Sequence, residues 1–412
     1  MKISASCRGS WRQGLGALSL LAMAWGLFAC GGSSHSTSTQ QTITSTGTNV
    51  AAISVNSGVP GIGYVDGAFA SVTVCVPGTS TCQTVPDVLV DTGSSGLRLL
   101  SSALTIALPQ QQSSGGNPIA ECLPFVSSYT WGQVETADVE LGGEKASSAP
   151  IQVIGTTYSV PTQCSDLGPG AETLETLGTN GILGVGLFPQ DCGTYCETVQ
   201  SSSVNLYYQC SSSTSCQPVG ESLAQQVVNP VTLFTTDNNG VIIELPSVPD
   251  GAASSVSGSL VFGIGTESNN QLGTATVYTA DSSSGNFSTN FQSSTFTGTS
   301  FIDSGSNGYF FPSSITQCPS NVAPGFYCPS STENLSATTV GTNNASTTIN
   351  FSIANAENLF NSNNAAFSDL GGTYSSSPAG FDWGLPFFFG RNVFVAIEGQ
   401  NVPSGPAPYW AY

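Results

Sequence analysis

The sequence predicts an all-β protein built as two lobes, and three observations lead to that prediction. Val, Ile, Thr, Phe and Tyr occur in short alternating runs between turn residues, a pattern typical of strands. Helical runs rich in Lys, Glu and Ala are nearly absent. A chain of 412 residues is also long enough to form two hydrophobic cores. We therefore expect a bilobal β fold with few short helices.

The N-terminal residues resemble an export signal, and we set them apart from the fold. Basic residues precede an apolar run over 18–28, which is shorter than a typical membrane span. The run ends in a small residue followed by Cys30. This favours a lipoprotein signal peptide over residues 1–29, with Cys30 as the lipidated first residue of the mature chain. The alternative is an ordinary signal peptide in which Cys30 is incidental.

Composition divides the remaining chain into three parts. Residues 30–54 are rich in Ser and Thr and predict a flexible tether, although a propeptide is an open alternative. Pro and Gly cluster at 246–257, so we expect one β lobe over 55–250 and a second over 251–412. By resemblance to bacterial lipoproteins, no Asp directly follows Cys30, which favours the outer membrane or the periplasmic face. We expect an exported, membrane-anchored monomer.

In the first lobe, alternating residues over 64–90 predict strands that lead directly into Asp91. Residues 128–139 alternate again, and a turn at 141–143 follows them, so a hairpin is expected. The apolar run 180–187 contains closely spaced glycines, which suits a buried strand against another backbone.

The rest of the chain repeats this pattern with one exception. Residues 222–228 are one of the few predicted helices, ended by an Asn-Pro pair. Apolar runs at 241–245 and 258–263 predict strands near the midpoint, and 393–397 predict another strand near the end.

The chain is strongly acidic, and this charge limits its partners. The predicted signal contains three of the six basic residues and no acidic residue, so the mature chain has a formal charge of −22. Such a charge excludes nucleic acid as a partner. So few basic groups also suit an acidic environment, because protonated carboxyl groups would leave little net charge to destabilise the fold.

Ten cysteines remain after Cys7 and Cys30 are set aside, an even number that predicts disulfides in an exported protein. Loop-length spacings predict the bonds Cys75–Cys82 and Cys318–Cys328. Six further cysteines allow many connectivities, of which Cys192–Cys196 and Cys210–Cys216 fit their spacing. The cysteines left open are Cys122, Cys164, Cys192, Cys196, Cys210 and Cys216.

The residues that the sequence lacks limit its chemistry. His35, in the predicted tether, is the only histidine, so Ser-His-Asp catalysis, Cys-His catalysis and the usual zinc site lack an imidazole. No Gly-rich loop with a following Lys is present to bind phosphate. We expect no metal site. Acid–base chemistry in the folded part must therefore depend on carboxyl groups.

Two stretches, 88–96 and 300–308, each place an Asp-(Thr/Ser)-Gly-Ser motif at the end of an apolar run. The motifs supply Asp91, Thr92, Gly93 and Ser94 in the first copy, and Asp303, Ser304, Gly305 and Ser306 in the second. Each glycine permits a tight turn, the following Ser can orient its carboxylate, and Thr92 or Ser304 can bond to the opposite loop. Two carboxyl groups brought together in this way can share one proton.

These motifs resemble the pepsin-like aspartic proteases. Residues 180–184 resemble the glycine strand behind that family's first aspartate loop, and 385–395 resemble its counterpart in the second lobe. Residues 258–263 resemble the strand between the lobes, so the resemblance spans about 55–400. It implies a double β-barrel with a central cleft for an extended polypeptide, Asp91 and Asp303 as a catalytic pair, and no cofactor.

Two departures from that family concern the cleft. Tyr129 is the expected flap residue and Trp131 a second candidate, although either can also be an ordinary strand aromatic. Arg98 occupies a position where the family often has Trp. We expect it in the cleft, where a cation favours ionised carboxylates, or on the surface.

The resemblance implies an aspartic endopeptidase that is anchored as a lipoprotein. The alternative is a non-catalytic surface lipoprotein of the same fold that holds a peptide or protein in its cleft. The intact Asp91 and Asp303 motifs favour the enzyme, whereas Arg98 and the altered flap keep the binding alternative open.

Overall fold

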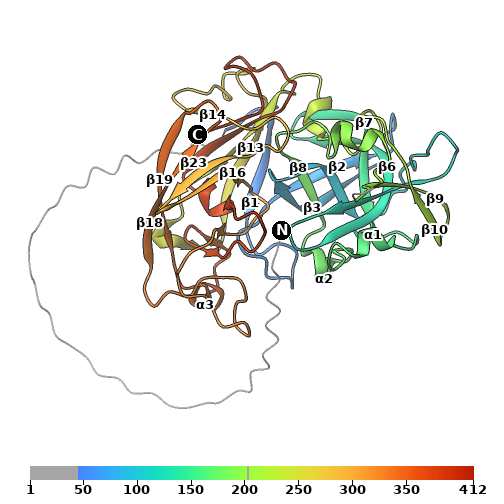
Figure 1. The fold of residues 1–412 in the computed structure, drawn as a ribbon. Coiled ribbons are helices and arrows are strands. Elements are labelled where there is room, and N and C mark those ends of the chain that lie inside the picture. Colours follow the sequence, from blue (N-terminus) through green and yellow to red (C-terminus); the bar gives the residue numbers. More distant parts are fainter. Residues whose placement is uncertain (1–44, 202–203) are drawn as a thin grey trace, which may run out of the picture.

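The computed structural model describes residues 45–201 and 204–412 (Figure 1). The predicted signal peptide, Cys30 and most of the predicted tether lie outside these residues. The predicted all-β, two-lobed fold is confirmed, because strands form both lobes and the helices of the described part are short. These helices are α1 (Thr162–Ser165), α2 (Leu174–Leu177) and α3 (Ala356–Phe360), with 3₁₀ turns η1 (Ser101–Ala103), η2 (Gly193–Glu197), η3 (Pro230–Leu233), η4 (Pro249–Gly251) and η5 (Leu385–Phe388).

The first lobe is a closed barrel of six strands. In order around the barrel they are β2 (Ala68–Cys75), β3 (Cys82–Asp91), β8 (Gly181–Val185), β4 (Ser95–Leu100), β7 (Glu144–Ile154) and β6 (Tyr129–Leu141). The barrel closes because β6 also pairs with β2. Small and β-branched side chains such as Val72, Val90 and Val139 fill its interior, which suits the narrow space inside a six-stranded barrel.

A hairpin extends from this barrel toward the candidate site. β5 (Ile119–Pro124) pairs with the first half of β6, and β9 (Tyr207–Ser212) and β10 (Ser215–Pro218) continue the sheet from β5. The turn of the β5–β6 hairpin is formed by residues 125–128. The predicted hairpin between 128 and 143 is also confirmed, as the β6–β7 pair.

A central sheet joins the two lobes and lies between them in Figure 1. Its strands are β1 (Val50–Val55), β13 (Val256–Phe262), β11 (Gly240–Leu245), β23 (Arg391–Ala396), β24 (Tyr409–Ala411) and β14 (Val277–Thr279). β1 overlaps the end of the tether predicted over 30–54, so the prediction is wrong for residues 50–54, which form part of a strand. Ile53 and Val55 are buried there, and β1 pairs with both β13 and β2.

The second lobe is a seven-stranded sheet around an aromatic core. Its strand order is β19 (Ser346–Ile353), β18 (Glu333–Val340), β15 (Phe287–Phe291), β16 (Ser294–Ile302), β22 (Phe381–Trp383), β17 (Tyr309–Phe310) and β21 (Gly371–Gly372). A short pair, β12 (Ala252–Ala253) with β20 (Ala366–Phe367), lies apart from this sheet. Phe311 stacks on Phe381, and Phe381 stacks on Trp383. Burial of these large rings stabilises the sheet from which Asp303 emerges.

The predicted helix over 222–228 is wrong, since this segment forms turns. Its polar groups find better partners elsewhere in the fold. The amide of Gln226 donates to the carbonyl oxygens of Gly193 and Glu221, and the backbone N–H of Val228 bonds to Pro150. The Gln226 N–H still donates to the Ser222 carbonyl oxygen, which is one i to i−4 bond. The next two N–H groups donate to other segments, that of Val227 to the Tyr207 hydroxyl and that of Val228 to Pro150 O, so the turn does not continue as a helix.

The described residues form five disulfides, including all four pairs that the spacing favoured. They are Cys75–Cys82, Cys122–Cys164, Cys192–Cys196, Cys210–Cys216 and Cys318–Cys328. Cys122–Cys164 spans 42 residues, so no local spacing could indicate it. Disulfides are typical of proteins in an oxidising or extracellular compartment. Over the described residues, no helix has the length and apolar character needed to cross a membrane.

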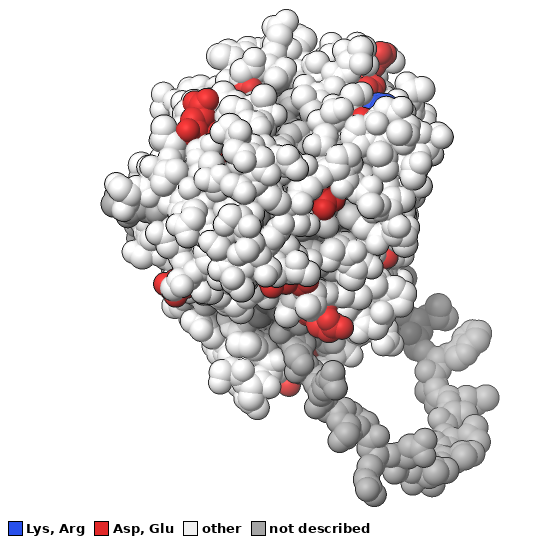
Figure 2. Space-filling view, turned by 90° about the vertical axis from the view of Figure 1, so that its right-hand side faces the viewer, with Lys and Arg blue, Asp and Glu red and all other residues white. Residues whose placement is uncertain are grey.

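The surface carries few charged side chains, and those visible in Figure 2 are mostly acidic. The folded part contains three basic residues, of which Arg98 is fully buried and Lys145 is exposed and paired with Asp138.

Candidate active site

Two equivalent loops at the junction of the lobes hold the predicted aspartates. β3 ends at Asp91, and Asp303 directly follows the end of β16. β8 runs parallel to β3 and supports the first loop, as the glycine-rich pattern predicted. β22 runs parallel to β16, and the N–H of Asp303 donates to the carbonyl oxygen of Trp383 at 3.1 Å.

Thr92 and Ser304 join the two loops through four hydrogen bonds, two of which they exchange with each other. The N–H of Thr92 donates to the Ser304 Oγ at 3.1 Å, and the N–H of Ser304 donates to the Thr92 Oγ1 at 2.9 Å. Each hydroxyl also donates to the opposite strand, Thr92 to Ile302 O at 3.1 Å and Ser304 to Val90 O at 2.8 Å. The two loops therefore hold each other in an arrangement with approximate twofold symmetry.

Each carboxylate receives the same two hydrogen bonds within its own loop. In the first loop, the Gly93 N–H donates to Asp91 Oδ1 at 2.8 Å and the Ser94 hydroxyl donates to Oδ2 at 2.6 Å. In the second loop, the Gly305 N–H and the Ser306 hydroxyl bond to Asp303 at 2.8 Å each. These bonds fix the orientation of both carboxyl groups, as expected for the supporting residues.

The glycines let the two carboxyl groups approach each other. A Cβ atom added to Gly93 would lie 2.7 Å from the Asp303 Cγ, and one added to Gly305 would lie 2.6 Å from the Asp91 Oδ1. Side-chain carbon atoms do not fit at such distances. Each glycine therefore provides the space that the opposite carboxyl group occupies, and Asp91 and Asp303 lie together.

The surroundings of the pair favour a shared proton. Asp91 and Asp303 are only 6% and 7% exposed. Burial, together with the charge of Asp303 and a hydrogen bond to it, raises the pKa of Asp91 to about 7, against the opposing effect of Ser94. Because two close carboxyl groups titrate as one unit, the pair retains a proton up to nearly neutral pH.

Two further titratable side chains near the pair, Tyr64 and Asp382, were not singled out from the sequence. Burial raises the pKa of Tyr64, and the charges of Asp91 and Asp303 raise it further, so its hydroxyl stays protonated. Asp382 on β22 is also buried, and desolvation followed by the charge of Asp303 raises its pKa well above the ordinary value. Neither residue belongs to a local motif, so the sequence offered no signal for them.

A cavity of about 530 Å³ opens at Asp91 and Asp303, and residues from both lobes line it. Most of its walls are apolar: Leu123, Pro124, Phe125 and Val126 from the β5–β6 hairpin, Leu187 and Phe188 after β8, and Phe301 from β16. An apolar wall around a few fixed polar groups is typical of a ligand site.

The predicted flap residues do not line this cavity. Tyr129 and Trp131 lie in β6 and are buried, with exposed fractions of 6% and 1%. The Trp131 indole donates to Tyr158 O at 3.0 Å, and its ring packs edge-on against Tyr208. Both residues are therefore ordinary strand aromatics, which was the alternative to a flap role. The hairpin residues at the cavity are instead Leu123 to Val126, of which Phe125 and Val126 lie in the turn that precedes Tyr129.

Arg98 lies behind the cavity wall and not in the cleft or on the surface, so both predicted positions are wrong. Its guanidinium is fully buried and forms ion pairs with Glu121 at 2.8 Å and Asp191 at 3.0 Å. Its charge is therefore balanced locally and is not directed at Asp91. Asp191 itself lines the cavity.

The described residues contain no group of three or more His, Cys, Asp or Glu side chains that could hold a metal ion. Cys30, the predicted lipidation site, lies outside those residues.

Comparison with known proteins gives a family and shows similarity to solved structures. The chain belongs to the family described as "Protein of unknown function (DUF3443)", whose model matches residues 45–412. No curated protein matches the chain. Among solved structures, an aspartic proteinase from Irpex lacteus is similar, with a TM-score of 0.47 and 16% sequence identity. That similarity covers 88% of this chain and 96% of the proteinase.

Proposed function

We propose that this member of the DUF3443 family is an aspartic endopeptidase of the pepsin-like type, with Asp91 and Asp303 as its catalytic pair. The observation that carries the proposal is the exchange of hydrogen bonds between Thr92 and Ser304. It holds two equivalent carboxyl groups together in an apolar cavity, where burial and mutual repulsion favour a single shared proton.

In the proposed reaction, one carboxyl group of the pair is ionised and the other is protonated. The ionised group removes a proton from a water molecule, whose oxygen attacks the carbonyl carbon of the peptide. The protonated group gives its proton to the carbonyl oxygen, which produces a neutral tetrahedral diol. This intermediate collapses when a proton passes to the leaving nitrogen, the C–N bond breaks, and the second hydroxyl returns its proton to the pair. The pair then again holds one proton.

The proposed substrate is an extended polypeptide that lies across the cavity between the lobes. The apolar walls would bind the side chains on either side of the cleaved bond, because their burial removes apolar surface from water. We further propose that the protein is exported, lipidated on Cys30 and monomeric. The five disulfides support an oxidising compartment.

The experiment is digestion of an unfolded protein by the soluble mature chain between about pH 3 and pH 7, the range in which carboxyl groups titrate. Asp91→Asn and Asp303→Asn are the matched variants, because Asn keeps the shape of Asp and cannot act as the base. We expect cleavage by the wild type, inhibition by a statine-type peptide, and no cleavage by either variant. Cleavage that persists in both variants would refute the proposed pair.

The alternative function is that of a binding protein that holds a peptide or protein in the same cavity. The apolar hairpin turn at Phe125 and Val126 favours it, because the expected Tyr129 is absent from the cavity. Under this alternative, neither the wild type nor any variant cleaves the substrate. The statine-type peptide would still bind to the wild-type chain.

A further inference from the structure

A cluster of four buried side chains lies directly behind the cavity wall of the first lobe. Arg98 Nη2 bonds to Glu121 Oε1 at 2.8 Å and to Asp191 Oδ2 at 3.0 Å. The Tyr207 hydroxyl donates to Asp191 at 2.8 Å and accepts from the Val227 N–H at 2.8 Å. The exposed fraction of the Arg98, Glu121 and Asp191 side chains is between 0% and 1%.

The cluster is balanced in charge when it holds one proton. One guanidinium faces two carboxyl groups, and Tyr207 is neutral because burial raises its pKa well above the ordinary value. Burial, and then the neighbouring Glu121, also raise the pKa of Asp191 well above its ordinary range, against the effects of Arg98 and Tyr207. Glu121 Oε2 lacks a donor among the described residues. A proton on Asp191 leaves one guanidinium facing one carboxylate, so the cluster is neutral overall.

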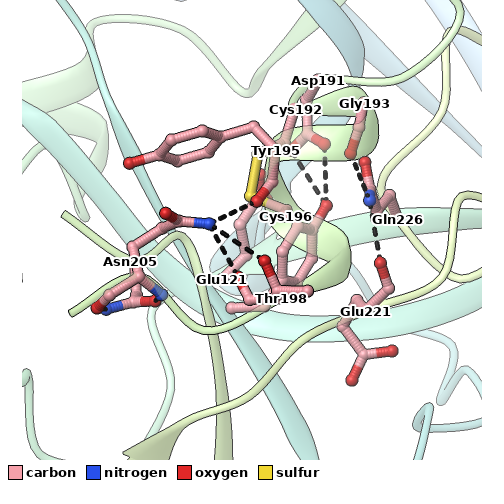
Figure 3. The surroundings of a disulfide bond; sticks show 12 residues. Glu121, Asp191, Cys192, Gly193, Tyr195, Cys196, Thr198, Asn205, Glu221 and Gln226 are labelled. Atoms are coloured by element: carbon pink, nitrogen blue, oxygen red, sulfur yellow. Dashed lines mark hydrogen bonds between the residues drawn. A yellow bond between two sulfur atoms is a disulfide. The ribbon is translucent and has the colours of Figure 1, made fainter. Parts of the chain in front are cut away.

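Each carboxyl group of the cluster belongs to a segment that forms the cavity. Glu121 lies in β5, two residues before Leu123, where the hairpin begins to line the cavity. Asp191 ends the cavity-lining segment after β8 and directly precedes the Cys192–Cys196 disulfide (Figure 3). The cluster thus connects two parts of the wall that are far apart in sequence.

Arg98 also reaches the first aspartate loop. Its Nη1 donates to the carbonyl oxygen of Ser95 at 2.8 Å, and Ser95 directly follows the Ser94 that orients Asp91. The Ser95 hydroxyl in turn donates to Phe188 O in the cavity wall at 2.7 Å. One guanidinium is therefore bonded to the loop of the catalytic pair, to the hairpin and to the segment after β8.

We propose that Arg98 is a positioning residue, which holds the β5–β6 hairpin through Glu121 at the distance from the Asp91 loop that substrate binding requires. This inference rests on the proposed function. It assigns Arg98 to the geometry of the substrate site and not to the reacting atoms. Its direct consequence is that loss of the Arg98–Glu121 bond weakens substrate binding and leaves the chemical step largely intact.

Two substitutions at one position separate this role from a general effect on folding. Glu121→Gln and Glu121→Leu remove the same charge, and in both variants Arg98 can pair with an ionised Asp191. Gln keeps an oxygen that accepts from Arg98, whereas Leu has none. Arg391→Met is the control for loss of a charged side chain away from the cavity, since Arg391 lies in β23, donates to Phe387 O in η5 and does not line the cavity.

The measurements are KM and kcat for one fluorogenic peptide, with hydrogen exchange of the hairpin amides over 119–126. We expect Glu121→Leu to raise KM about tenfold, the effect of one charge-assisted hydrogen bond, and to change kcat by no more than about twofold. Exchange in the hairpin should become faster. In Glu121→Gln, KM and the exchange rate of the hairpin should stay near the wild-type values. Arg391→Met should leave KM unchanged. Equal KM and exchange in the Gln and Leu variants would overturn the proposal.

If the wild type cleaves no peptide, the proposed function fails but the positioning role is still tested. The affinity for a statine-type peptide, measured by calorimetry, then replaces KM, and hydrogen exchange is read as before. Weaker binding and faster hairpin exchange in Glu121→Leu, but not in Glu121→Gln, support the role of Arg98. Identical values in the two variants contradict it.

Discussion

The two aspartate loops have nearly the same internal hydrogen bonds but very different surroundings. Asp91 and Asp303 each accept from a glycine N–H and from a serine hydroxyl. Behind the first loop lies the charged cluster of Arg98, whereas aromatic rings around Trp383 support the second loop. The chemistry of a shared proton depends on the symmetric pair. The surroundings can differ because each lobe needs only to hold its loop rigidly.

The largest expected effect tests the symmetry of the pair. Gly93→Ala and Gly305→Ala each place a Cβ atom against the opposite carboxyl group. A displacement of about 1 Å in the reacting groups costs on the order of a hundredfold in rate, so we expect at least that loss in both variants. The measurement is kcat/KM for one peptide.

Gly115→Ala is the control for these variants, because the nearest atom to its Cβ would be 3.7 Å away. Wild-type activity in either loop variant, or a large loss in only one of them, would contradict the equivalence of the two loops.

The exchanged hydrogen bonds between the loops should contribute similarly to stability from both sides. Thr92→Val and Ser304→Ala each leave a buried N–H without its acceptor, which costs about 1–3 kcal/mol. Chemical denaturation measures the change in the free energy of unfolding. Thr73→Val removes an exposed hydroxyl that pairs with Thr84, and it should cost much less. A neutral result for Thr92 or Ser304 would show that one loop does not depend on the other.

The first lobe should also make stability depend on pH. Burial raises the pKa values of Glu135 and Glu221 from 4.5 to about 7. The folded state therefore binds protons that the unfolded state releases, so their contribution is complete below about pH 4.5 and is lost as the pH rises through 7. Glu135→Gln should remove about 1–2 kcal/mol of this dependence, after allowance for solvent screening.

The measurement for this prediction is the melting temperature at pH 4 and pH 7.5. The difference should be smaller in Glu135→Gln than in the wild type. A wild-type chain that is more stable at pH 7.5 than at pH 4 would reverse the expected sign.

The smallest effect concerns the carboxyl group behind the second loop. Burial raises the pKa of Asp382 well above its ordinary value, which favours the neutral form, and Asn has nearly the same shape as that form. Asp382→Asn should therefore change kcat/KM by less than about twofold between pH 3 and pH 7. A tenfold fall in this pH–rate profile would mean that Asp382 is ionised and acts on Asp303.

The sequence predicted the parts of the site that are encoded locally. A strand that ends in Asp-(Thr/Ser)-Gly-Ser determines both the position of each carboxyl group and its hydrogen bonds, so the loops at Asp91 and Asp303 could be recognised. The disulfides with spacings of 4 to 10 residues were equally accessible.

The parts that depend on distant contacts could not be predicted. Arg98 lies close to Asp91 in sequence, but its partners Glu121 and Asp191 are 23 and 93 residues away. The alternating pattern around Tyr129 was compatible with a side chain that faces either the cavity or the core. In the structure Tyr129 packs in a buried cluster, so it faces the core. The helix predicted over 222–228 does not form because the backbone N–H groups of Val227 and Val228 donate to other segments.

The most direct test of the account is the pH dependence of kcat/KM for one peptide between about pH 3 and pH 9, measured for the wild type, Asp91→Asn and Asp303→Asn. The account predicts a wild-type profile that falls as the pH rises through about 7, where the pair around Asp91 loses its shared proton. Both variants should be inactive at every pH. A wild-type rate that stays level up to pH 9, or activity in either variant, would contradict a catalytic pair that shares one proton.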